Sequence, residues 1–225
     1  MTTSNNHRTT AIVGTAFAAL FVGAFATGGE PPEETAPAAD VIAYYSEHAS
    51  QLRLTGFVMV AAAVLLLFFA GGLRDALSRN GDDRLSTVAY GGAVAYAVSL
   101  GVMVVSALAL VAAADLGNAD AVTALNVLDN KMFPLFMVGL SATMLATGLR
   151  ALEVPVLPRW LAWLSTVLGI AAVAGPGGYA AFFAFPFWVV AVGVSLARRQ
   201  VPSAGTHDSA VLGAAGHDRD ARGVR

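Results

Sequence analysis

The chain alternates from end to end between long apolar blocks and short polar stretches. Six blocks carry no acidic, basic or histidine residue: 11–28, 54–73, 88–114, 132–149, 160–174 and 179–197. At about 1.5 Å of rise per residue, helices of these lengths cover most or all of a hydrocarbon core of roughly 30 Å. Only helices satisfy every backbone amide in such a segment. The pattern therefore predicts an all-α, polytopic transmembrane helical bundle with six spans.

The two ends of the chain differ from its apolar middle. Residues 1–10 are polar and predict a short N-terminal segment, followed by a transmembrane domain over 11–199. The tail, 200–225, is polar and rich in Gly and Ala without periodicity, so we expect it to be disordered. The fifth block is the shortest, and the sequence GPGG at 175–178 ends it.

Small residues recur at every fourth position in two of the blocks. One stripe consists of Thr15, Ala19, Gly23 and Thr27, and the other of Ala89, Ala93, Ala97 and Gly101. Such stripes let helix backbones approach closely, which is a main source of helix association in lipid. We therefore expect both stripes to be packing seams, although alanine-rich composition alone explains part of the pattern.

Arginine placement predicts the orientation of the bundle. With six spans, eleven of the 13 basic residues fall on the side that holds both termini, and only Arg53 and Lys131 fall on the other. Basic residues concentrate on the cytoplasmic side of membranes, so both termini are predicted to be cytoplasmic. Lys131 is the only lysine, and this bias, with abundant Ala, Gly and Val, is typical of a high-GC bacterial genome. The predicted location is the bacterial cytoplasmic (plasma) membrane, as a multi-pass protein.

The first block has a second interpretation. Arg8, the short apolar run and the sequence AFA at 24–26 also match a signal peptide that is cleaved after Ala26. Cleavage would leave five spans and an external N-terminus. We favour retention, because the small-residue stripe continues through Thr27.

Three stretches are similar to those of a known family: YYSEHASQLRLTGF at 44–57, FFAGGLRDALSRNGDD at 68–83 and LPRWLAWLSTVLGIAAVAG at 157–175. Together they resemble a domain-of-unknown-function family of roughly six-span integral membrane proteins that is common in actinobacteria. The resemblance covers about 40–199 and implies the same architecture. It implies no activity, cofactor or catalytic residue.

Composition and motifs argue against most chemistry. Charged residues make up 12% of the chain, against about a quarter in soluble domains, and there is no cysteine. The four histidines have no metal-ligand spacing, and no hydrolase or phosphoryl-transfer motif is present. The spans lack the buried charge that ion-coupled transporters use. We therefore expect no metal, no cofactor and no nucleic-acid partner, and an enzyme is the weaker class.

Polar side chains gather at two levels. On the predicted external side a candidate outer-rim cavity is bordered by Tyr44, His48, Asn126, Asp129, Asn130 and Lys131. We favour the alternative, in which these residues cap helix ends and hold the loops to one another, because helix termini need such partners. On the cytoplasmic side an anionic-lipid collar is predicted from Arg74, Arg79, Arg84, Arg150, Arg159, Arg198 and Arg199.

The segment 40–52 connects the predicted external side to the second span. It places Val41, Tyr44, Tyr45 and His48 on one helix face, which is typical of an amphipathic helix at the headgroup level. We expect this helix to bend into the span that follows it.

These features predict an integral membrane protein with a non-enzymatic accessory, scaffolding or regulatory role. Its expected partners are membrane lipids and either a protein partner or a second copy of the chain. One alternative is a facilitator of a small solute, lined by hydroxyls of the third span at Tyr90, Tyr96, Ser99 and Ser106. The other is a membrane enzyme that acts on a lipid substrate through the outer rim.

Overall fold

The computed structural model describes residues 2–27, 29–78 and 84–198, and its described part consists of eight helices and no strand. The helices are α1 (Thr2–Thr27), α2 (Ala38–Glu47), α3 (Ala49–Leu77), α4 (Arg84–Asp115), α5 (Ala119–Asn130), α6 (Phe133–Glu153), α7 (Arg159–Ala171) and α8 (Gly177–Arg198). The predicted all-α class is confirmed. The predicted disordered tail, 200–225, lies outside the described residues.

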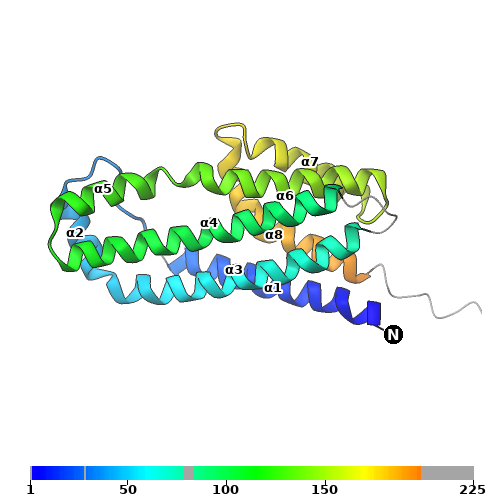
Figure 1. Cartoon of the computed structure of the whole chain (residues 1–225), viewed down its shortest axis with the longest axis horizontal. Helices are drawn as coiled ribbons and strands as arrows, with labels where there is room; N and C mark the ends of the chain where they lie inside the picture. Colours follow the sequence, from blue (N-terminus) through cyan, green and yellow to red (C-terminus); the bar gives the residue numbers. More distant parts are fainter. Residues whose placement is uncertain (1, 28, 79–83, 199–225) are drawn as a thin grey trace, which may run out of the picture.

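The helices run lengthwise in an elongated bundle (Figure 1). α3 packs against α1 and α4, α6 against α4 and α7, and α8 against α1 and α7, so the bundle closes on itself. The start of α1 and the end of α8 lie at the same end, which we call the terminal end. At the opposite end α2, α5 and the segment 29–37 form a structure that we call the cap.

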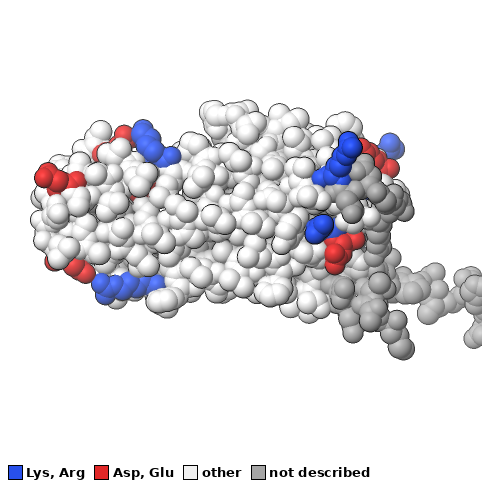
Figure 2. All heavy atoms as spheres, in the orientation of Figure 1, with Lys and Arg blue, Asp and Glu red and all other residues white. Residues whose placement is uncertain are grey.

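Five segments of the described chain are long and apolar enough to cross a membrane. They are His7–Thr27, Ala49–Leu77, Arg84–Asp115, Ala119–Glu153 and Gly177–Arg198. On the face drawn in Figure 2, acidic and basic side chains lie only towards the two ends, with a broad uncharged belt between them. Because a bilayer interior excludes charge, this distribution fits a multi-pass membrane protein.

The fifth predicted span, 160–174, is the one that does not reach membrane length. It forms α7, which has 13 residues and is therefore about 20 Å long. Gly175 then adopts a left-handed backbone conformation with φ of 59°, which turns the chain into α8. α7 and α8 form a hairpin packed on α6. α7 runs away from the terminal end, and after the turn α8 runs back towards it.

Close helix contacts occur at glycines that the fourfold stripes did not indicate. Gly92 and Gly139 bring α4 and α6 together, and Gly148 and Gly169 do the same for α6 and α7. A methyl group on Gly148 would lie 2.6 Å from the backbone nitrogen of Thr166. These seams have the backbone-to-backbone character of small-residue packing in lipid.

The predicted seam in the first span is wrong. Thr15, Ala19, Gly23 and Thr27 are all exposed on the outside of the bundle. The buried face of α1 instead carries large residues such as Phe17 and Phe21. Aromatic burial decides the rotation of α1, because these rings contact Phe185 and Phe182 of α8. The second predicted stripe is largely correct, since Ala89, Ala93 and Ala97 are buried while Gly101 has open space around it.

Candidate functional site

The cap is held together by polar contacts between α5 and the segment 29–37. Asn126 is buried, and its amide Nδ2 donates a hydrogen bond to the Glu33 carbonyl oxygen at 2.9 Å. The Lys131 ammonium pairs with the Glu34 carboxylate at 2.6 Å. Asn130 donates to the carbonyl of Asn126, its own i−4 neighbour, at 3.0 Å and more weakly to that of Pro32 at 3.4 Å. Asn126, Asn130 and Lys131 of the predicted rim therefore act as a clamp on this segment.

A cavity of about 160 Å³ lies beneath the cap, where α1, α2, α3, α4 and α5 converge. Its walls are mostly apolar and include Ala24, Phe25, Leu52, Met59, Met103 and Val104. Its polar groups come from Tyr44 and Tyr45 on α2, Thr55 on α3 and Asp129 on α5. The structure thus places Tyr44 and Asp129 of the predicted rim on the cavity wall, beneath the cap.

α2 supplies the aromatic wall of this cavity. Tyr44 and Tyr45 meet edge to face, with ring centroids 5.2 Å apart, and Tyr45 is only 2% exposed. α2 packs against α4 and α5, so Val41 and Tyr45 on the apolar face of the predicted amphipathic helix are buried in protein. Burial raises the pKa of the Tyr45 phenol, and the Asp129 carboxylate and Tyr44 raise it further. Burial also raises the pKa of the Tyr44 phenol. Both phenols therefore stay neutral at physiological pH.

His48 lies at the elbow between α2 and α3, next to the cavity wall. Its ring stacks on Tyr44 with centroids 4.5 Å apart, and its Nδ1 lies 2.9 Å from the Tyr44 carbonyl oxygen. The His48 backbone N–H also donates to that carbonyl. His48 therefore stabilises the bend between α2 and α3, and its stacked ring holds the Tyr44 ring in place.

Of the described residues that line the cavity, Asp129 is the only charged one. The side chain is half-buried, and no basic side chain of the described residues forms an ion pair with it. The neighbouring basic groups have other partners, since Lys131 pairs with Glu34 and Arg53 pairs with Asp115. The buried hydroxyl of Ser106, on α4, lies near the Asp129 carboxylate.

A second hollow lies on the outside of the bundle between α1 and α3. This groove has a volume of about 460 Å³ and is lined by Gly23, Ala24, Thr27, Gln51, Leu54, Thr55 and Val58. Ala24 and Thr55 line both the groove and the cavity, so the two spaces are neighbours. The Gln51 amide donates a hydrogen bond to the Thr27 carbonyl at the cap end of the groove.

The hydroxyls predicted to line a solute path lie in different surroundings. Tyr96 is fully buried among aromatic rings, and its hydroxyl has no hydrogen-bond partner among the described residues. Ser99 donates to the carbonyl of Ala95 in its own helix. Tyr90 lies under the Arg74 guanidinium at 5.6 Å. Most of these groups are thus enclosed by packing, and Ser106 alone lies near the cavity.

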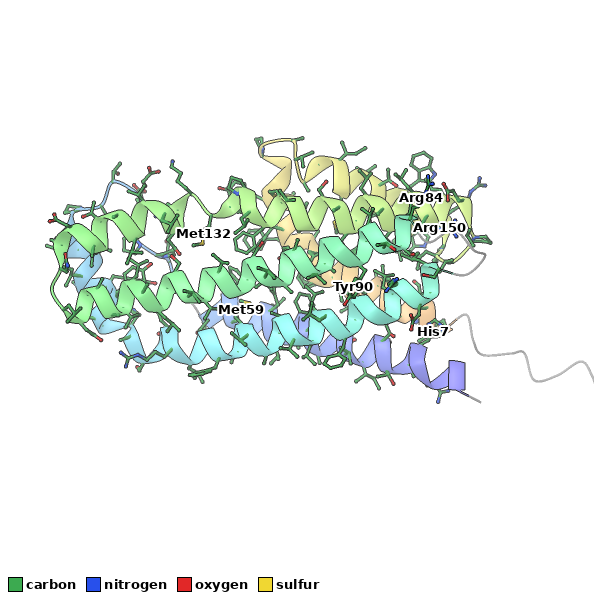
Figure 3. The ribbon with its side chains drawn as sticks, viewed as in Figure 1. His7, Met59, Arg84, Tyr90, Met132 and Arg150 are labelled. Atoms are coloured by element: carbon green, nitrogen blue, oxygen red, sulfur yellow. The ribbon has the colours of Figure 1, made fainter. Side chains whose placement is uncertain are left out.

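The predicted collar is at the terminal end, where Figure 3 shows Arg84 and Arg150 together with His7. Arg74, Arg84, Arg159 and Arg198 are exposed, as a lipid-binding collar requires. Arg150 departs from this prediction. It is only 5% exposed, and its Nε donates to the Leu77 carbonyl at 3.1 Å. Its guanidinium thus ties the end of α3 to α6, because a buried arginine must satisfy its donors. Arg79 and Arg199 lie outside the described residues.

Sequence reasoning missed Tyr45, Thr55, Met59 and Met103 as cavity residues. Only the tertiary packing shows that these side chains share a space, since α2, α3 and α4 come from separate parts of the sequence. The described residues contain no cluster of three or more side chains that could hold a metal ion. Comparison of the chain with protein families, curated proteins and solved structures gives no match, so the family resemblance stays a prediction.

Proposed function

We propose that this chain is a non-enzymatic accessory component of the bacterial cytoplasmic membrane that binds part of an amphiphilic molecule beneath its cap. The observation that carries this proposal is the cavity itself, an apolar space beneath the cap with a few converging polar groups. Ligand sites of membrane and soluble proteins share this composition. The groove between α1 and α3, which shares Ala24 and Thr55 with the cavity wall, supports access to this site from the side of the bundle.

The proposed topology has six crossings with both termini in the cytoplasm, the cap outside and α1 retained. Arg74, Arg84 and Arg198 at the terminal end support this orientation through the preference of basic residues for the cytoplasmic side. The packing of α1 against α3 and α8 supports retention, because cleavage would remove Phe17 and Phe21 from the core. α7 completes the sixth crossing together with the turn at Gly175.

Cysteine labelling tests this topology, because the native chain contains no cysteine. Thr35→Cys lies in the cap segment, Pro155→Cys between α6 and α7, and Ala174→Cys at the α7–α8 turn. With a membrane-impermeant maleimide on intact spheroplasts, we expect labelling at positions 35 and 174 and none at 155. Labelling at 155 would reverse the orientation. An Ala174 variant labelled only after permeabilisation would reduce the crossings to four.

Native mass spectrometry of gently extracted protein tests the binding function. Ala107→Phe places a ring in the cavity, because Ala107 is part of its wall. Val105→Phe is the matched control, since Val105 lies on the same helix and is 67% exposed. We expect a bound small molecule of defined mass on the wild type and on Val105→Phe, and its loss from Ala107→Phe. A bare wild-type protein, or a bound mass that survives Ala107→Phe, would contradict the proposed site.

A further inference from the structure

The chemistry of the cavity wall points to the charge of its ligand. Among the described lining residues, Asp129 contributes the only formal charge, and two basic side chains at this end of the bundle, Lys131 and Arg53, are paired with Glu34 and Asp115. A carboxylate at the edge of an apolar space is stabilised by an opposite charge that shares the space. The cavity therefore has space for a cationic group of a ligand, and the Asp129 carboxylate is available as its counter-ion.

The aromatic and sulfur-containing walls suit the same class of ligand. Tyr44 and Tyr45 of α2 line the cavity. The faces of tyrosine rings are electron-rich and attract alkylammonium groups. Met59 and Met103 add polarizable thioethers, which adapt to the shape of an alkyl group. An anionic or phosphate-bearing head has no counterpart here, since none of the lining residues is basic.

The volume limits the ligand further. A space of about 160 Å³ is close to the roughly 150 Å³ of a cavity that accommodates benzene. It is well below the roughly 300–1,000 Å³ of sites for drug-sized molecules. The cavity thus holds a compact head and not a whole amphiphile. The rest of such a molecule needs an exit, and the groove beyond Ala24 and Thr55 provides one of about 460 Å³.

We propose that the cavity binds the alkylammonium head of a single-chain amphiphile, with Asp129 as its counter-ion and its tail in the groove between α1 and α3. This inference rests on the proposed binding function and adds the ligand class. The head lies between Asp129 and the tyrosine rings of α2. The chain passes between Ala24 and Thr55 and follows Leu54 and Val58 into lipid.

The test uses two probes of similar head size and chain length on full-length protein in dodecyl maltoside. Dodecyltrimethylammonium carries a positive charge, and dodecyldimethylamine N-oxide is net neutral. Isothermal titration, with empty micelles as the blank, measures both. We expect the cationic probe to bind the wild type about tenfold more tightly, as a charge-assisted contact in a partly dry site implies. Equal affinity for the two probes would overturn the proposal without any variant.

Asp129→Asn keeps the shape of the side chain and removes its charge. We expect it to lose the tenfold preference for the cationic probe and to keep the affinity for the neutral one. The matched control is Asp120→Asn, an exposed carboxylate on the same helix, which should keep the preference. A preference that persists in Asp129→Asn, or that falls equally in Asp120→Asn, would overturn the role of Asp129.

A third variant separates this inference from the proposed function. Gly23→Trp fills the groove from a position where an added side chain meets nothing within 4 Å. We expect it to weaken both dodecyl probes about tenfold while leaving the short tetramethylammonium ion unaffected. If Ala107→Phe abolishes binding of both probes but the wild type shows no charge preference, the binding function holds and this inference fails. If neither probe binds the wild type, and no native ligand is found, the binding function itself fails.

Discussion

Gly92 and Gly139 bring the backbones of α4 and α6 into direct contact, because a methyl group on Gly139 would lie 2.7 Å from the Gly92 carbonyl oxygen. The same methyl group would lie 2.5 Å from the backbone nitrogen of Tyr96. The obstacles are backbone atoms, which cannot move without shifting a whole helix. This contact therefore sets the spacing of the two central helices.

Gly139→Ala should destabilise the bundle by about 1 to 3 kcal/mol, the usual cost of overpacking a tight interface. Unfolding in mixed micelles of increasing dodecyl sulfate content measures the change. Gly101→Ala is the control, since Gly101 lies in α4 with open space around it. It should be neutral or stabilise by up to about 1 kcal/mol through helix propensity. Equal effects of the two substitutions would show that the seam does not limit stability.

Arg150→Met should destabilise the terminal end of the bundle. The substitution removes a charged donor from the Leu77 carbonyl, and such hydrogen bonds contribute about 1.5 to 3 kcal/mol. Arg150→Lys should rescue only part of this, because an ammonium cannot reproduce the guanidinium fork. The measurement is thermal unfolding in detergent. Arg159→Met, at an exposed position of the collar, should change the midpoint little, and a comparable loss there would contradict the structural role of Arg150.

Asn126→Ala should release the cap segment. The side chain donates to the Glu33 carbonyl, and losing one such bond costs about 1 kcal/mol. Hydrogen–deuterium exchange over 29–37 should become faster, while exchange in α4 stays unchanged. Thr123→Ala is the control on the same helix, because that hydroxyl bonds only to the carbonyl of Ala119. Unchanged exchange in Asn126→Ala would show that Lys131 and Glu34 hold the segment without it.

Tyr96→Phe should raise the midpoint of thermal unfolding. Within the part of the chain that the structure describes, the buried Tyr96 hydroxyl has no hydrogen-bond partner, a situation that costs about 1 to 3 kcal/mol. The phenylalanine ring keeps the contacts with Phe136 and Phe185. Ser165→Ala is the opposite case, because its hydroxyl accepts the Trp188 indole N–H at 2.7 Å, and it should lower the midpoint. A destabilised Tyr96→Phe protein would indicate a role for this hydroxyl in contacting a ligand or water.

For the predicted rim residues, the sequence could predict which side chains lie close together but not what each side chain contacts. Asn126 and Asp129 are one helical turn apart, so their proximity could be predicted from spacing. Their roles could not, because Asn126 binds the segment 29–37 and Asp129 faces the cavity. A rotation of α5 by a fraction of a turn separates these roles, and only packing against α2 and α4 fixes that rotation.

The sequence by itself determined the helical class and the positions of five membrane-length helices, because uninterrupted apolar blocks leave the backbone no other stable form in lipid. Tertiary structure alone decided which face of each helix is buried. Phe17 and Phe21 turn α1 so that the stripe of Thr15, Ala19, Gly23 and Thr27 points outwards, against the sequence expectation. Tertiary structure also decided that Arg150 binds the Leu77 carbonyl oxygen and is not part of the exposed collar. The partner of such a long side chain depends on which helix end lies within its reach. The cavity belongs to the same category, because five helices from distant parts of the chain contribute its walls.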